Sequence, residues 1–178
     1  MNRTVAILIC LSAAMLFTPD DIHGQSRSIG ATFSYAGTGV EYALDVDEGN
    51  FAEFQLRMET AEMFRRAGSL PGISASAFWN IIFSKFKSSN GNPIRFYAGP
   101  GITLGYDADL QSPHGLIFGV KGRIGGECAF PRGISISMNI SPAVGGHFGV
   151  TDGMVNMRVY RNGLLQILMP EASIRYRF

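Results

Sequence analysis

The chain ends in the segment EASIRYRF (171–178), in which polar and apolar side chains alternate without a break. The apolar positions are Ala172, Ile174, Tyr176 and Phe178, and the polar ones are Glu171, Ser173, Arg175 and Arg177. Successive side chains of a β-strand point to opposite faces, so this segment is predicted to be a strand with one apolar face. Because the ends of soluble domains usually fray, an alternation that continues to a final aromatic ring indicates an apolar environment for that ring.

The same two-residue period recurs along most of the chain. FAEFQLRMET (51–60) sets apolar side chains against glutamates, a glutamine and an arginine, and ISISMNIS (134–141) sets them against serines and an asparagine. The pattern predicts eight strands, at residues 28–35, 39–46, 52–61, 73–86, 94–106, 115–129, 134–147 and 165–178.

The connections between these strands differ in length. Three are short polar turns, DEGN (47–50), SSNGNP (88–93) and FPRG (130–133), and three are longer, at 62–72, 107–114 and 148–164. The first connection, AGTG (36–39), is also short. Short turns at one end, longer loops at the other and an even strand count are typical of outer-membrane barrels, whose tilted strands need about 9–11 residues to span. The predicted fold is all-β, an eight-stranded antiparallel up-and-down transmembrane barrel.

The polar face of these strands carries acids and bases in equal numbers. They are Glu41, Asp45, Glu53, Glu59, Glu127 and Glu171, and Arg57, Arg95, Lys121, Arg123, Arg175 and Arg177. The outer face of a soluble sandwich needs no such balance, whereas an unpaired charge inside a narrow barrel costs several kcal/mol. The balance therefore favours a barrel with an interior charge network. In the segment 73–86, Phe78 and Ile82 fall on the inner face, which indicates a bulge.

The first residues are predicted to be a cleaved leader. MNRTVAILICLSAAMLF (1–17) has Arg3 followed by an apolar run that is too short for a membrane helix of about 20 residues and is typical of a signal peptide. We expect residues 1–24 to be the signal peptide and residues 25–178 to form the barrel domain. The remaining chain has one cysteine, Cys128, which excludes an internal disulfide, and its net charge of about +2 argues against nucleic-acid binding.

With its leader, eight alternating strands and terminal SIRYRF (173–178), the chain resembles the small outer-membrane β-barrel proteins of Gram-negative bacteria, of the OmpX, OmpA membrane-domain and OmpW type. The stretches YAGPGITLGY (97–106) and GMVNMRVYRNGLL (153–165) also resemble uncharacterised barrels of Bacteroidetes. The resemblance implies that Tyr176 and Phe178 are recognised by the barrel-assembly machinery. It also implies a location in the cell outer membrane, with both termini in the periplasm.

A search for catalytic patterns points away from an enzyme. A barrel-type lipid deacylase would have a serine two residues after its histidine, but His147 is followed by Phe148 and Gly149. GPGITLG (99–105) lies within a predicted strand and has no helix behind it, so it is not predicted to bind phosphate. We predict no catalytic residue, metal or cofactor.

The interior of an eight-stranded barrel is just wide enough to be filled by side chains, so the charged residues are predicted to form a plug. Function is then expected at the outer loops, as membrane structure, surface interaction or adhesion. Candidate extracellular contacts are Arg65, Arg66, Met157, Arg158, Tyr160 and Arg161, and the segment MVNMRVY (154–160) could form either a hairpin or an apolar lip. The alternatives are an OmpW-like conduit for small hydrophobic solutes, hinted at by Phe78 and Ile82, and a lipid-modifying enzyme. The expected partners are outer-membrane lipids and lipopolysaccharide, the assembly machinery and an unidentified surface ligand, and the barrel is expected to be a monomer.

Overall fold

The computed structural model describes residues 26–65, 70–110, 112–151, 154–166 and 169–178. Its strands are β1 (Arg27–Ser34), β2 (Gly37–Asp45), β3 (Asn50–Glu59), β4 (Gly72–Lys87), β5 (Pro93–Asp109), β6 (Ser112–Ala129), β7 (Ile134–Ile140), β8 (Ala143–Thr151), β9 (Met154–Val159) and β10 (Glu171–Arg177). Two short helices, α2 (Ala61–Arg65) and α3 (Arg161–Leu165), and a 3₁₀ turn (Pro131–Gly133) lie between them. Among these residues, no helix has the length and apolar character needed to cross a membrane.

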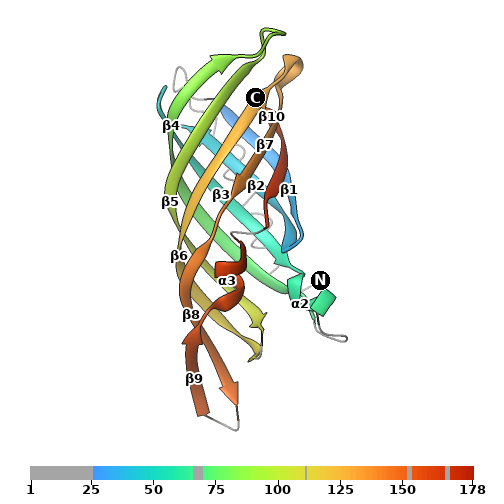
Figure 1. Ribbon diagram of the computed structural model, residues 1–178, viewed down its shortest axis with the longest axis vertical. Helices are drawn as coiled ribbons and strands as arrows, with labels where there is room; N and C mark the ends of the chain where they lie inside the picture. Colours follow the sequence, from blue (N-terminus) through green and yellow to red (C-terminus); the bar gives the residue numbers. More distant parts are fainter. Residues whose placement is uncertain (1–25, 66–69, 111, 152–153, 167–168) are drawn as a thin grey trace, which may run out of the picture.

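The strands form a closed antiparallel barrel (Figure 1). Neighbours in sequence pair from β1 to β6, β6 pairs with both β7 and β8, and β10 pairs with β7 on one side and with β1 on the other. The strand is interrupted at Ser141 and Pro142, so β7 and β8 follow one another in the same position of the wall. Eight positions therefore close the ring, which is the predicted eight-stranded up-and-down architecture.

Burial in the barrel is the reverse of that in a soluble domain. Along β3, Glu53 is fully buried, whereas its neighbour Phe54 is 55% exposed. The same holds along β10, where Arg175 is 1% exposed and Ile174 is 55% exposed. Apolar side chains thus cover the outside and polar ones fill the lumen, as lipid surroundings require.

The predicted irregularity in β4 is present. The pairing of β4 with β5 shifts register between Ile82 and Ser84, and Phe83 at this bulge is 60% exposed. Phe78 is 3% exposed and points into the lumen, where Lys121 and Arg123 lie over its ring. Ile82 packs against a small apolar cluster of Ala43, Phe51 and Tyr97.

The prediction of a strand at 165–178 is wrong in its first part. The last strand begins at Glu171, and residues 161–165 form α3. The backbone N–H groups of Arg161 and Asn162 donate to the Asp109 carboxylate at 3.1 and 2.9 Å. This contact with β5 starts a helix inside the predicted loop 148–164, and the helix ends at Leu165, the first residue of the predicted strand.

The longer predicted loops are mostly regular structure. β5 continues to Asp109 and β6 starts at Ser112, so the predicted loop 107–114 is a tight turn. Most of the predicted loop 148–164 belongs to the end of β8, to β9, which pairs with it, and to α3. Of the two alternatives for MVNMRVY, the hairpin is therefore the one observed. In the predicted loop 62–72, the first residues belong to α2.

The two ends of the barrel differ. The turn end carries the short connections 46–49, 88–92 and 130–133 and the C-terminus, whereas the cap end carries α2, α3 and the β8–β9 hairpin (Figure 1). The wall is also uneven in length, since β6 has 18 residues and β10 has 7. The β6–β8–β9 side consequently extends beyond the rest of the cap end (Figure 1).

Gly99 is predicted to be essential for closure of the barrel. A Cβ atom at this position would lie 2.8 Å from Asn80 Cα and would overlap the Trp79 carbonyl oxygen, so β4 and β5 could not approach as they do. We expect Gly99→Val to destabilise the folded barrel by about 2 kcal/mol or more, measured as the urea midpoint of refolding in lipid vesicles. Gly122→Val is the matched control, because a Cβ there meets nothing within 4 Å. Equal midpoints for the two variants would contradict this account.

Candidate functional site: the lumen and its two ends

The twelve charged residues singled out in the sequence all lie along the lumen. Nine of them are at most 4% exposed, namely Glu41, Glu53, Arg57, Glu59, Lys121, Arg123, Glu127, Glu171 and Arg175. Asp45, Arg95 and Arg177 are partly exposed at the turn end, with side chains 20%, 14% and 32% exposed. Eleven of the twelve form ion pairs with one another, so most of the predicted network is connected.

Arg175 is the centre of the network. Its guanidinium donates to Glu41 on β2, to Glu53 on β3 at 2.7 Å and to Glu127 on β6 at 3.2 Å. Ser173 on the same strand donates to the second oxygen of Glu41. One buried side chain of β10 thus links three other strands across the lumen.

A second group of ion pairs continues the network toward the cap end. Arg123 pairs with Glu53, and at 3.3 Å with Glu171. Arg57 donates to the other oxygen of Glu171 at 3.0 Å and lies 3.5 Å from Glu59. Gln55 donates to Glu171 at 2.7 Å, so polar groups surround this carboxylate. These donors offset part of the cost of burying the carboxylate.

Lys121 differs from the other cations of the lumen. Its side chain is buried, yet among the described residues it forms no ion pair within 4 Å, and its ammonium lies 5.5 Å from the centre of the Phe78 ring. The Nε atoms of Arg57 and Arg123 are also buried and have no partner among these residues. These donors are suited to binding water inside the lumen.

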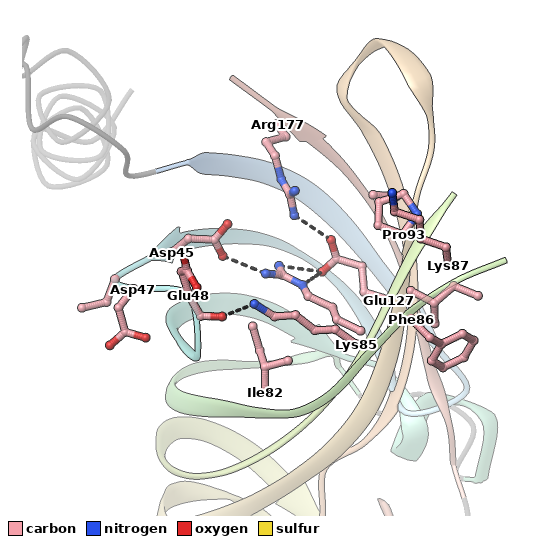
Figure 2. Close-up of a pocket in the computed structure, with 14 residues that line it drawn as sticks. Asp45, Asp47, Glu48, Ile82, Lys85, Phe86, Lys87, Pro93, Glu127 and Arg177 are labelled. Atoms are coloured by element: carbon pink, nitrogen blue, oxygen red, sulfur yellow. Dashed lines mark hydrogen bonds and ion pairs between the residues drawn. The ribbon is translucent and has the colours of Figure 1, made fainter. Parts of the chain in front are cut away.

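The turn end opens into a cavity of about 950 Å³ (Figure 2). The base is formed by Arg95, which contacts Asp45 and Glu127 at 2.9 Å, and by Arg177, which donates to Glu127 at 3.0 Å. Lys85 reaches from β4 to the carbonyl oxygen of Glu48 (Figure 2). Asp47 and Lys87 also line the cavity, and the other lining residues, such as Ile82 and Pro93, are apolar. The cavity is therefore a vestibule that ends at the charge network.

The turn beside this vestibule is held by its own carboxylate. Asp47 accepts hydrogen bonds from the Asn50 side chain, at 2.9 and 3.0 Å, and from the Gly49 N–H at 2.7 Å. The Asn50 side chain and then the Gly49 N–H hold the pKa of the exposed Asp47 carboxyl below its ordinary value. The sharp turn between β2 and β3 is stabilised by these bonds.

The cap end is closed by contacts that the sequence did not indicate. Asn162 of α3 donates to Glu62 of α2 at 3.0 Å and to the carbonyl oxygen of Ala108 at 3.1 Å. Arg65 donates to Asn162 at 2.7 Å and to Glu62 at 3.1 Å. Together with Asp109, these residues join α2, α3 and the end of β5. We refer to α2 and residues 160–166 as the cap.

The residues predicted to be extracellular contacts differ in their exposure. Met157, Arg158 and Arg161 are exposed, and Arg65 is exposed although it pairs with Glu62. Tyr160 differs from the prediction, because it is 3% exposed, packs against Ile117 and Ala143, and donates through its hydroxyl to Asp107 at 3.3 Å. It therefore cannot be a surface contact. Arg66 lies outside the described residues, as does the predicted signal peptide 1–24.

The terminal aromatic residues lie on the outer face. Tyr176 is 55% exposed and Phe178 is 53% exposed, so both rings point away from the lumen at the turn end. Their recognition by an assembly machinery stays a prediction.

His147, which was considered as a catalytic residue in the sequence analysis, is buried and hydrogen-bonded to the backbone. His147 is 1% exposed, and its Nε2 lies 3.0 Å from the carbonyl oxygen of Asp107. A carbonyl oxygen can only accept, so Nε2 carries the proton and cannot serve as a base at this contact. Among the described residues, no group of three or more His, Cys, Asp or Glu side chains is placed to hold a metal ion. The absence of catalysis stays a prediction.

Several polar residues that take part in the charge network of the lumen were not identified from the sequence. Gln55, Asn139 and Ser173 hydrogen-bond to the carboxylates of the network. They lie on the same face of their strands as the charged residues, so the alternation could have identified them. In contrast, the cap residues Asp109 and Asn162 are 53 residues apart and carry no local signal of their contact.

Comparison with known proteins supports the fold. No protein-family model and no curated protein sequence matches the chain. Among solved structures, it resembles a major outer membrane protein from Thermus thermophilus, with 14% identity and a TM-score of 0.51 over 88% of this chain and all of the other. It also resembles Neisserial surface protein A (NspA), with 12% identity and a TM-score of 0.41 over 86% of this chain and 96% of the other. At this identity, the first similarity establishes a shared barrel fold and nothing about activity.

Arg175 is predicted to contribute most to stability among the lumen charges. Arg175→Met would leave Glu41, Glu53 and Glu127 without their shared cation, so we expect a loss of about 3–5 kcal/mol in the free energy of unfolding. Lys87→Met removes the same charge from an exposed position and should change stability by less than about 0.5 kcal/mol. Urea unfolding in lipid vesicles measures both, and a small effect of Arg175→Met would show that the network is not stabilising.

Proposed function

We propose that the protein is an integral outer-membrane barrel with a sealed interior, and that it acts as a membrane anchor that presents its cap end at the cell surface. The observation that carries this proposal is the inverted burial, with apolar side chains outside and paired charges inside. An exposed apolar belt of this kind is stable only in lipid.

Aromatic side chains at both ends support a membrane-spanning position. At the turn end, Phe96 packs against Phe83 and Phe86, with ring centres 6.4 and 5.7 Å apart. At the cap end, Tyr35 and Phe64 stack at 5.5 Å and remain more than half exposed. Aromatic residues favour the boundary between membrane and water, so these pairs are placed to mark the two interfaces.

The interior is suited to a plug. The ion pairs of Arg175, Arg123 and Arg57 cross the lumen between the vestibule and the cap. Moving these side chains aside would separate buried charges, at a cost of several kcal/mol for each pair. A pore through this section would therefore be costly to open.

The surface role is assigned to the cap end. The β8–β9 hairpin carries Met157 and Arg158 as exposed residues, and Arg161 follows it. Arginines at this rim are suited to lipopolysaccharide phosphates, because a guanidinium can bind phosphate through two hydrogen bonds. Both termini would then lie in the periplasm.

The conduit for hydrophobic solutes is the second candidate, and the vestibule is the observation in its favour. Its apolar lining includes Ile82, Phe86 and Ile94. However, the aromatic rings beyond it lie beneath guanidinium groups: Arg95 is 4.6 Å from the ring centre of Phe51, and Arg123 is 3.6 Å from that of Phe78. The apolar surface therefore ends at the charge network. A lipid-modifying enzyme is third.

Planar-bilayer recording tests the plug. The purified, heat-modifiable protein is expected to give no reproducible conductance steps, because the network blocks the lumen. Arg175→Met provides a comparison in which the block is weakened. Regular small steps from the unmodified protein would overturn the sealed barrel and favour the conduit.

Surface tagging tests the orientation. A peptide epitope inserted in 148–164 is expected to bind antibody on intact cells, whereas the same epitope in 88–93 is expected to bind only after permeabilisation. Antibody binding to the 88–93 epitope on intact cells would mean that the barrel is inserted the other way round.

A further inference from the structure

The barrel wall is incomplete at the cap end. β10 pairs with β7 only as far as Glu171 and Asn139, while β8 pairs on that side with β9. At the cap end, therefore, no strand pairing closes the wall between the β8–β9 hairpin and β1 within the described part of the chain. The helix α3 lies across this part (Figure 1).

α3 reaches three separate points of the rim. Gly163 lies against β8, where an added Cβ would be 2.7 Å from the Ala143 carbonyl oxygen. Asp109 at the end of β5 accepts the N–H groups of Arg161 and Asn162. Glu62 of α2, which follows β3, accepts from the Asn162 side chain. A segment fixed to β8, β5 and α2 spans the opening of the lumen.

The contacts that hold this segment are mainly polar. Asp109, Asn162 and Glu62 act through hydrogen bonds, and a small buried apolar cluster joins Tyr160 to Ile117 and Ala143. Hydrogen bonds at a rim can be exchanged for water at modest net cost, whereas a strand inside the bilayer cannot release its backbone groups. The cap is thus held much less firmly than the wall.

Polar groups lie directly beneath the cap. Asp107 is 3% exposed and accepts from the Tyr160 hydroxyl, and Ser74, one layer deeper, donates to Glu59 at 2.6 Å. Lys121 lies deeper still, buried and without an ion pair among the described residues. Water that entered at this end would meet groups able to bind it.

We propose that residues 160–166 form a hinged lid over the upper lumen, with Asp109 as its latch. When the lid opens, the compartment of Asp107, Glu59 and Ser74 becomes accessible from the cap side, while the charge network below stays closed. The inference rests on the proposed membrane barrel and adds a reversible compartment to it.

Thiol labelling of Ser74→Cys tests the lid. The variant is made with Cys10→Ala and Cys128→Ala, and the purified protein in detergent is treated with a membrane-impermeant maleimide. Adding Asp109→Ala removes two hydrogen bonds to a charged group, so labelling should be about tenfold faster or more. Asp47→Ala is the matched control, because this carboxylate also accepts a backbone N–H but belongs to a turn at the opposite end. It should leave the labelling rate of Ser74→Cys unchanged.

A second reporter distinguishes lid opening from general loosening. Ser135→Cys lies in the lumen toward the turn end, and its labelling rate should not respond to Asp109→Ala. Two outcomes would overturn the proposal. One is a labelling rate of Ser74→Cys that is the same with and without Asp109→Ala. The other is that Asp109→Ala speeds up labelling at both Ser74→Cys and Ser135→Cys. If Asp109→Ala does not refold, Asn162→Ala is judged by the same criteria. Heat modifiability and the silent bilayer of the unmodified protein test the membrane barrel separately.

Discussion

The contact of Arg175 with three carboxylates is the interaction on which the rest of the barrel depends. Glu41, Glu53 and Glu127 come from β2, β3 and β6, and Arg175 belongs to the last strand of the chain. These acids can be neutralised by Arg175 only when β10 has joined β1 and β7. Closure of the ring and neutralisation of its interior are therefore one event. An open barrel would leave both a free strand edge in lipid and three carboxylates without this cation, and each is costly there.

Sequence alternation predicted the wall because one physical rule, two faces per strand, holds at nearly every position. Parity alone sets the side of a strand on which a residue lies, and the twelve charged residues that it put on one face lie along the lumen of the structure. It failed where distant contacts decide the structure. Residues 161–165 form a helix because Asp109, 52 and 53 residues earlier, accepts its first N–H groups. Tyr160 was expected at the surface because it lies in the predicted extracellular loop 148–164, whereas Ile117 and Ala143 bury its ring.

The two ends of the molecule follow from unequal strands. β4, β5 and β6 have 16, 17 and 18 residues, whereas β1 and β10 have 8 and 7. At a rise of about 3.3 Å per residue, the long side exceeds the short side by tens of ångströms along the strands. At the turn end, short turns leave a vestibule open. At the cap end, the short strands stop early, and the chain must close the opening with helices, whose polar contacts make that closure the weaker one.

Lys121 lies between the arginine network and the section of the lumen beneath the cap. Five arginines share the six carboxylates of the network, and the planar guanidinium suits them because it can bridge two or three acids at once. Lys121 completes the balance of charge but forms no ion pair within the described part of the chain, so its charge acts on Glu59 and Glu171 only at longer range. A compact ammonium with unfilled donors needs water more than a shared guanidinium does. The lumen therefore changes along its axis, from a section in which arginines bridge the carboxylates to a section beneath the cap in which a lysine has donors left for water.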